Sequence, residues 1–104
     1  MAKFPFSDLH SFKDYVIYAQ TYLPDRFPPR KEVGAEAQWS LDLAFKALRF
    51  GLDLAEQEKG ELAVFSDCRK LVGEAHELYA AGDSRAGFFK LDEVNTLLRR
   101  VPSQ

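Results

Sequence analysis

Apolar residues recur every three or four positions along most of the chain, which is the spacing of one face of an α-helix. No stretch of useful length alternates apolar and polar residues, so the sequence predicts no β-strands. Four segments carry the helical period, namely 8–23, 32–58, 61–81 and 85–101. The expected fold is all-α, a single antiparallel up-down four-helix bundle that takes in residues 1–104.

The first helix has clear end signals and is followed by a proline-rich connector. Ser7 or Asp8 can cap the helix, and Pro24 ends it because a proline ring disfavours helical geometry in the preceding residue. Residues 24–31 hold three of the five prolines and cannot form regular helix or a central strand. We interpret them as a stiff connector, with Pro29 near the start of the next helix. A proline-rich ligand for an aromatic groove is the alternative.

Short reversals separate the last three segments. Lys59-Gly60 predicts the first reversal, after which the third helix returns antiparallel to the second. Gly82 fits the left-handed position that ends many helices, and Asp83 or Ser84 can cap the last helix. Both connections are therefore expected to be short.

The segment 32–58 is the longest element and is apolar over more than half of its circumference, as expected of a central helix. Its polar stripe contains opposite charges four residues apart, which pair on a solvated helix. The stripe is therefore expected to face water rather than to form a binding site. The pairs are Asp42 with Lys46 and Arg49 with Asp53.

Several single residues indicate how the helices pack. Gly34, Gly51 and Gly73 fall inside the predicted helices and indicate close approaches, because each costs about 1 kcal/mol relative to alanine. Cys68 is expected to face the core as a small hydrophobe. The period also places Phe88 on the inward face of the last helix.

The first helix carries two apolar stripes, one of them made of tyrosines, and needs partners on two sides. The chain is 46% apolar and 13% aromatic, and a 104-residue monomer has limited interior to hide these side chains. Wide apolar surfaces mark interfaces, and closed homo-oligomers are their commonest form. The alternative, that the aromatic residues are core or rim of one bundle, stays open. The residues expected at an interface are Tyr15, Tyr18, Tyr22, Trp39 and Phe50.

Charge and cysteine content exclude several classes of protein. The chain has 14 basic and 16 acidic residues and only small basic clusters, so nucleic acid is disfavoured as a partner. A single cysteine cannot form an intramolecular disulfide or a four-cysteine zinc site. No apolar run approaches the ~20 residues of a membrane span, and the N-terminus lacks the apolar stretch of a signal peptide. We therefore expect a cytoplasmic protein with no membrane partner.

No spacing of reactive side chains predicts a catalytic or metal site. His76 lacks the glutamate three residues before it that a metal site in a bundle uses, and zincin spacing also fails. We therefore expect no catalytic residue, no metal and no organic cofactor, so the protein is not expected to be an enzyme. The run Ala-His-Glu-Leu at 75–78 resembles the setting of the histidine in four-helix phosphotransfer domains. Tyr79 and Ala80 replace the Lys and Gly of that setting, and a phosphotransfer-like unit stays as an alternative.

Residues around the connector match the spacing of a known family: Phe-Pro at 27–28, Gly34 and Gln38. With Ala-Glu at 55–56 and four helices of matching order and length, the chain resembles the small four-helix proteins encoded in intervening sequences of bacterial ribosomal RNA genes. Those proteins share their fold with the accessory variability determinants of diversity-generating retroelements. The resemblance implies a bundle that forms a homo-oligomer, commonly a pentamer, with a nucleic-acid role. The family's paired arginines after Gln38 are Trp-Ser-Leu here, at 39–41, which puts that role in doubt.

These observations predict a small non-enzymatic helical protein that acts as a homo-oligomeric protein–protein interaction or scaffold module. Its expected partner is a second copy of itself, and a further protein partner stays open. The alternatives are an RNA- or nucleoprotein-associated four-helix protein and the histidine phosphotransfer-like unit. The mass in solution is the measurement that tests the wide apolar surfaces directly.

Overall fold

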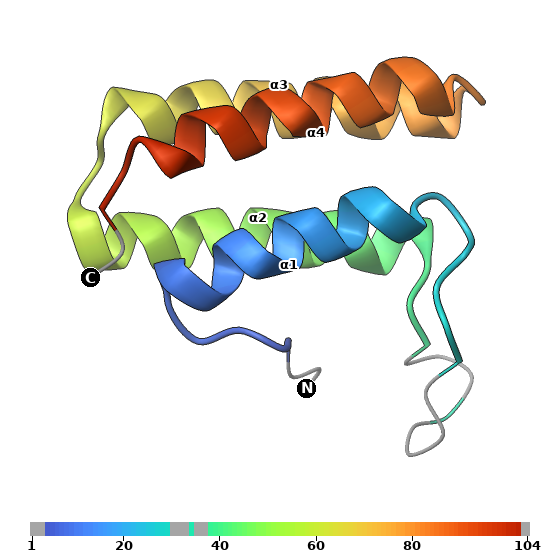
Figure 1. The fold of residues 1–104 in the computed structure, drawn as a ribbon, viewed down its shortest axis with the longest axis horizontal. Helices are drawn as coiled ribbons and strands as arrows, with labels where there is room; N and C mark the ends of the chain where they lie inside the picture. The colour runs from blue at the N-terminus through green and yellow to red at the C-terminus, as the bar shows by residue number, and fades with distance from the viewer. Residues whose placement is uncertain (1–3, 30–33, 35–37, 103–104) are drawn as a thin grey trace.

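The computed structural model describes residues 4–29, 34 and 38–102. This part of the chain holds four helices and no strand, which confirms the predicted all-α class. The helices are α1 (Leu9–Tyr22), α2 (Leu41–Lys59), α3 (Ala63–Ala80) and α4 (Ser84–Arg99). Each helix packs on two others, α1 on α2 and α4, and α3 on α2 and α4. Figure 1 shows the result as two layers, with α1 beside α2 and α3 beside α4.

Local hydrogen bonds set the start of α1. The Asp8 carboxylate accepts a bond from the Ser11 amide at 2.8 Å, and the Ser11 hydroxyl accepts one from the Asp8 amide at 3.3 Å. This reciprocal pair is a capping box, which satisfies two amides that the helix itself cannot. A further amide, that of Leu9, donates to the Glu58 carboxylate of α2 at 3.1 Å. The helix ends before Pro24, as predicted.

Glycines with positive φ form the two tight reversals. Gly60 (φ 93°) ends α2, and Gly82 (φ 90°) follows the end of α3. Glycine adopts this conformation at low cost because it has no Cβ. Asp83 then caps α4, with its carboxylate accepting a bond from the Ala86 amide at 3.1 Å. The predictions for Gly82 and for a cap at Asp83 are confirmed.

The second helix begins later than the sequence predicts. It starts at Leu41 rather than near residue 32, and neither Gly34 nor 38–40 is helical. The Ser40 hydroxyl caps α2 by accepting a backbone bond from its first turn at 3.1 Å. Serine competes for backbone hydrogen bonds and therefore favours a helix start over a helix interior. The other residues of the predicted helix before Leu41, namely 32, 33 and 35–37, lie outside the described residues.

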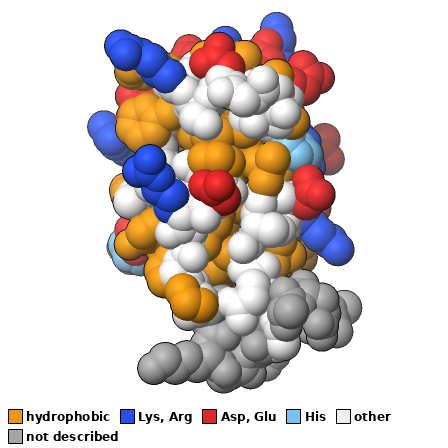
Figure 2. All heavy atoms as spheres, turned by 90° about the vertical axis from the view of Figure 1, so that its right-hand side faces the viewer, with side chains coloured by type: hydrophobic (Ala, Val, Ile, Leu, Met, Phe, Trp, Pro, Cys, Tyr) orange, Lys and Arg blue, Asp and Glu red, His pale blue; other side chains and the backbone are white. Residues whose placement is uncertain are grey.

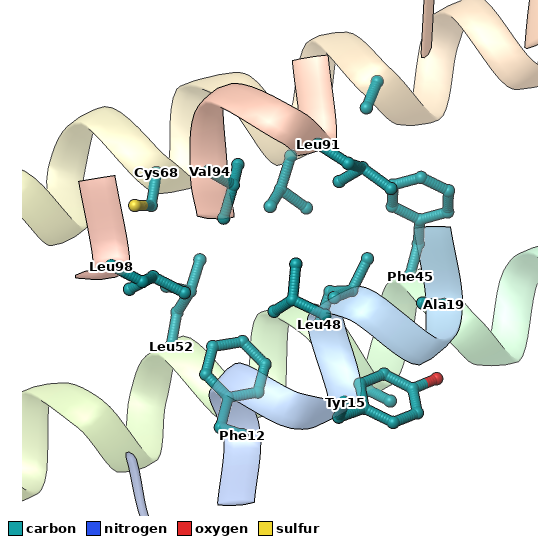
Figure 3. Close-up of a cluster of buried hydrophobic side chains, with 14 of the residues drawn as sticks. Phe12, Tyr15, Ala19, Phe45, Leu48, Leu52, Cys68, Leu91, Val94 and Leu98 are labelled. Atoms are coloured by element: carbon teal, nitrogen blue, oxygen red, sulfur yellow. The ribbon is translucent and has the colours of Figure 1, made fainter. Parts of the chain in front are cut away.

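The core fills the space between the two layers (Figure 3). All four helices contribute fully buried side chains, each of which stabilises the fold by about 1.5–3 kcal/mol. Cys68 is among them, which confirms its predicted place in the core. The largest are Leu9, Phe12, Val16, Phe45, Leu48, Leu52, Phe65, Val72, Leu91, Val94 and Leu98.

Two glycines permit close approach between side chains and a helix backbone. A Cβ built on Gly51 of α2 would lie 2.0 Å from Cε1 of Phe12, so the ring of Phe12 fills the space that a side chain would need. This confirms the approach predicted at Gly51. The same prediction is wrong at Gly73, where nothing lies within 4 Å, and Gly34 lies outside any helix. The sequence analysis missed Gly87, where a Cβ would lie 2.7 Å from the Tyr79 ring.

A buried polar bridge joins α1 to α4. Gln20 and Asn95 are 8% and 6% exposed, and the Asn95 side-chain amide donates to the Gln20 side-chain oxygen. The Gln20 amide donates in turn to the Phe88 carbonyl and to the Asp92 carboxylate, both at 3.4 Å. Phe88 therefore lies at the edge between α1 and α4, where its side chain is 41% exposed. The prediction that Phe88 faces inward is wrong, because this polar bridge occupies that edge.

Candidate functional site

Eight aromatic rings form a cluster on the side of the molecule that α1 and α2 share, and the cluster continues into the core through the Phe6–Phe12 contact. Neighbouring ring centroids lie 4.9–6.4 Å apart, and the planes are stacked or tilted by 11–59°. Such offset pairs add about 0.5–1.5 kcal/mol each beyond the area that they bury. We call this set the aromatic cluster: Phe4, Phe6, Tyr15, Tyr18, Tyr22, Phe27, Trp39 and Phe50.

The rings of the aromatic cluster range from buried in the core to exposed at the surface. Phe6 and Tyr15 are buried, at 7% and 3% exposed, and Phe50 is 43% exposed. The remaining five rings are half-buried, and all of them except Tyr22 pack against the core. Figure 3 shows the Tyr15 ring at the margin of the core, with its oxygen directed away from Leu48. Phe4 and Phe50 therefore rest on buried Phe6, and Tyr18 and Trp39 rest on buried Tyr15.

All five aromatic residues predicted for an interface belong to this cluster. The structure places Tyr15 inside, and Tyr18, Tyr22, Trp39 and Phe50 reach the surface. Their role as an interface between copies stays a prediction. Because Tyr15 is buried within its own chain, it supports the neighbouring rings rather than offering a surface of its own.

Sequence reasoning missed three rings of the cluster, Phe4, Phe6 and Phe27. All three lie outside the helices, so the helical period does not reach them. A signal was present in the alternation of phenylalanine and proline before the first helix, since a short extended segment can lay rings against a helix. Phe27 follows from the same reasoning, because it precedes two prolines.

A groove opens in the middle of the aromatic cluster. It has a volume of about 440 Å³, and its lining includes the rings of Tyr15, Tyr18 and Trp39 together with Pro5. Ser11 and the exposed Asp14 complete the described lining. The Ser11 hydroxyl is occupied in the capping box, so Asp14 is the charged group of the described wall. We call this feature the aromatic groove; its size falls in the range of about 300–1,000 Å³ typical of ligand sites.

The polar stripe of α2 pairs with α3 and not within its own helix. The Arg69 guanidinium donates to the Asp53 and Glu56 carboxylates, each at 2.5 Å, and these bonds raise the pKa of Arg69. Arg49 likewise contacts His76 rather than Asp53. The stripe is exposed, as predicted, but the predicted pairs within α2 are wrong, because Arg69 and His76 of α3 reach across to it.

His76 lies in this polar seam between α2 and α3. Its ring stacks on Phe45 with centroids 4.5 Å apart and planes at 5°. Nδ1 lies 3.1 Å from an Arg49 nitrogen, which can only donate, so Nδ1 accepts and Nε2 carries the proton. Nε2 faces the Asp42 carboxylate at 3.6 Å. Both ring nitrogens therefore face side chains of α2, and a phosphotransfer role for His76 stays a prediction.

Among the described residues, no group of three or more histidine, cysteine, aspartate or glutamate side chains is placed to hold a metal ion. No described helix has the length and apolar character needed to cross a membrane.

Two buried groups make stability depend on alkaline pH. Burial raises the pKa of Cys68 from 9.0 to about 12, helped by the charge of Asp67, and burial raises the pKa of Tyr79 from 10.0 to about 12. Above their ordinary values the unfolded chain releases these protons and the folded chain keeps them. The free energy of unfolding is therefore expected to fall between pH 9 and 12. Urea unfolding at a series of pH values measures this fall, which Cys68→Ala should delay to above pH 10. A flat profile from pH 9 to 12 would contradict the assignment.

The aromatic cluster is thus the most developed surface feature of the described residues. It brings together rings from both sides of the connector between α1 and α2. Phe27 and Gln38 of this region also carry the family resemblance, which stays a prediction. No family model, curated protein or solved structure matches this chain.

Proposed function

We propose that this protein is a non-enzymatic module that assembles with copies of itself through the aromatic cluster. The observation that carries the proposal is the continuity of the cluster from buried Tyr15 to exposed Phe50. Monomeric proteins rarely leave large contiguous apolar patches in water. Aromatic side chains also dominate the centres of protein interfaces, where each buries a large area with few rotatable bonds.

The rigid support of the cluster favours binding further. Phe6 supports Phe50, and Tyr15 supports Tyr18 and Trp39, so these rings lose less freedom when a partner covers them than unsupported rings would. The outer rings also contact one another, as Tyr18 does with Trp39 at 6.4 Å. A preorganised patch of this kind suits a permanent interface.

We propose an antiparallel up-down bundle as the scaffold for this surface. The short reversals after α2 and α3 support it, since they place successive helices side by side with opposite directions. The packing of α1 against both α2 and α4 is the arrangement that such a bundle requires. In Figure 1 the colour gradient reverses direction at each connection, which agrees with this topology.

A second exposed apolar area, on α1 and α4, is less suited to self-association. Ile17, Phe88 and Phe89 are 41–53% exposed, but Arg85 lies over the Phe89 ring at 5.8 Å. Figure 2 views the end of the molecule that includes the start of α4, and basic and acidic side chains interrupt the hydrophobic ones there. Covering such a surface would require removing water from several charges. We therefore propose the aromatic cluster as the interface. We also propose that the protein is cytoplasmic.

The substitution Phe50→Asp tests this proposal with little risk to folding, because the ring is already 43% exposed. The wild-type protein is expected to have a mass in solution of more than one chain. Loss of an aromatic anchor at an interface weakens association by roughly 30-fold or more, so the variant should shift toward the monomer. Sedimentation equilibrium over a concentration series measures the shift, and circular dichroism checks that helix content is retained.

Phe89→Asp is the matched control, since Phe89 is an exposed phenylalanine of α4 outside the cluster. It should leave the assembled mass unchanged. A second test is Tyr18→Asp, which changes the centre of the cluster rather than its edge. The proposal is wrong if the wild-type protein is monomeric at high concentration, or if Phe89→Asp and Phe50→Asp lower the mass equally.

A further inference from the structure

We infer that the cavity between the end of α1 and the start of α4 binds a small organic anion, a phosphate or carboxylate group carried on an apolar body. The cavity has a volume of about 700 Å³, and its described lining comes from the end of α1 and the turn after it, the end of α3 and the start of α4. These segments meet at the right-hand end of Figure 1. We call this feature the α1–α4 cavity; the residues of its lining that bear on a ligand are Leu23, Asp25, Arg26, Tyr79, Arg85 and Phe88.

Two arginines of the lining have free hydrogen-bond donors. Arg26 and Arg85 are exposed, and no carboxylate of the described residues forms an ion pair with either guanidinium. The turn that carries Arg26 is held by a bond from its amide to the Tyr22 carbonyl at 2.8 Å. Arg85 lies over the Phe89 ring at 5.8 Å, a contact that uses no N–H donor. Planar guanidiniums bind phosphate and carboxylate groups through paired bonds, so the two arginines favour an oxyanion.

A buried tyrosine supplies a third donor to the same cavity. Tyr79 is 5% exposed and lines the cavity, and its ring packs on Phe45 with centroids 5.9 Å apart. No described residue bonds to its hydroxyl, whose oxygen nevertheless keeps contact with solvent. Burial raises the pKa of Tyr79 to about 12, so the hydroxyl keeps its proton at neutral pH and can donate. Polar groups on buried side chains nearly always have a partner, so this hydroxyl indicates a ligand acceptor in the cavity.

Apolar side chains form another part of the described wall. Leu23 is buried, Pro24 is half-buried and Phe88 is 41% exposed. Ligand sites commonly combine apolar walls with a few polar groups that fix the orientation of the ligand. An apolar body would cover this wall and release water from it, while the anionic group meets the arginines. The wall therefore favours an organic anion over an inorganic one.

One carboxylate of the lining opposes an anion and limits its affinity. Asp25 is exposed and pairs with neither arginine, so two guanidiniums against one carboxylate leave the described lining with one net positive charge. The Asp83 carboxylate at the start of α4 accepts a bond from the Ala86 amide and is not part of the described lining. The balance of charge still favours an anion.

Titration of the full chain with phenyl phosphate, followed through the amide NMR signals, tests the inference. Phenyl phosphate should shift the amide signals of Arg26, Ser84 and Arg85, which line the cavity, and the shifts should saturate. It should bind roughly fivefold or more tightly than inorganic phosphate, which lacks the apolar body. Phenylacetate carries a carboxylate in place of the phosphate, so its affinity shows which of the two anionic groups the cavity prefers.

Three substitutions test the individual contacts with phenyl phosphate. Tyr79→Phe removes only the hydroxyl and should weaken binding by roughly tenfold, because a hydrogen bond to a charged acceptor is lost. Arg85→Gln should weaken binding by roughly fivefold or more through the loss of a charged donor. Asp25→Asn should instead strengthen binding by about two- to fivefold, because it removes a repulsion. Arg99→Gln is the matched control, since Arg99 is an exposed arginine of α4 outside the described lining.

The outcomes are separate from those that test self-association, because the inference uses no residue of the aromatic cluster. The inference is overturned if neither phenyl phosphate nor phenylacetate gives saturable shifts at the cavity. It is also overturned if Tyr79→Phe or Arg85→Gln weakens binding no more than Arg99→Gln, since the anion would then respond to overall charge alone. Equal affinity for inorganic phosphate and phenyl phosphate would contradict the choice of an organic anion. A wild-type protein that is monomeric would leave the cavity and its ligand unaffected.

Discussion

Replacing Gly51 by alanine is expected to lower the free energy of unfolding by about 3 kcal/mol, at the upper end of overpacking effects. The new Cβ would stand 2.0 Å from Cε1 of Phe12 and 2.1 Å from its Cδ1, well inside van der Waals contact. Phe12 is fully buried, so its ring cannot swing into water to make room. Either α1 must move away from α2 or the ring must leave its rotamer. Urea unfolding followed by circular dichroism measures the loss.

Gly73→Ala is the matched control for this prediction. Gly73 also lies in a helix, but nothing lies within 4 Å of its Cβ position. Alanine there should stabilise the protein by about 0.5–1 kcal/mol through helix propensity alone. In a Phe12→Ala background, the penalty of Gly51→Ala should largely disappear. Equal effects at the two glycines would show that Phe12 does not limit the approach of α1 to α2.

Asn95→Leu is expected to destabilise the protein by about 1–3 kcal/mol, the cost of leaving a buried polar group without its partner. Asn95 donates to the Gln20 side-chain oxygen, and both residues are buried. The leucine side chain cannot donate a hydrogen bond, so the Gln20 side-chain oxygen loses this donor. Water has little access to that oxygen. Urea unfolding again measures the change.

The double variant Gln20→Leu with Asn95→Leu should recover much of that loss, because no buried polar atom of the pair remains unsatisfied. Thr96→Ala serves as a control on the neighbouring exposed position, and its effect should stay within about 0.5 kcal/mol. Additive losses from the two leucine substitutions would contradict a direct bridge between α1 and α4.

Local signals explain why three of the four helices could be predicted to within two residues of their ends. A capping aspartate, a proline and a left-handed glycine each act through their own backbone, so the sequence carries the information. The start of α2 is different. The apolar period continues through residues upstream of Leu41, but among the described residues the Ser40 hydroxyl caps the helix at Leu41 and the Trp39 ring before it packs on Tyr15. The apolar periodicity of the sequence carries no information about the cap or about the ring contact.

Contacts between helices account for what the sequence could not predict. Arg69 and His76 fall on the apolar period of α3, and Asp53 falls on the polar stripe of α2. Long side chains at the border of two helices can satisfy both patterns, so the ion pair of Arg69 with Asp53 is not visible in either one. The aromatic cluster was half predictable for a similar reason. Tyr15, Tyr18, Tyr22 and Phe50 follow a helical period, whereas Phe4, Phe6 and Phe27 lie outside the helices, as does Trp39, which the sequence predicted within a helix.

The bond from the Leu9 amide to the Glu58 carboxylate has a consequence for amide hydrogen exchange. Most amides in the first turn of a helix exchange whenever that turn frays, and the Ser11 amide, whose acceptor Asp8 is local, should do so. Leu9 takes its acceptor from the last turn of α2 instead. Its protection should be lost when α1 separates from α2 or when the Glu58 side chain rotates away, so Leu9 reports the contact between the two helices at a position where exchange normally detects only fraying.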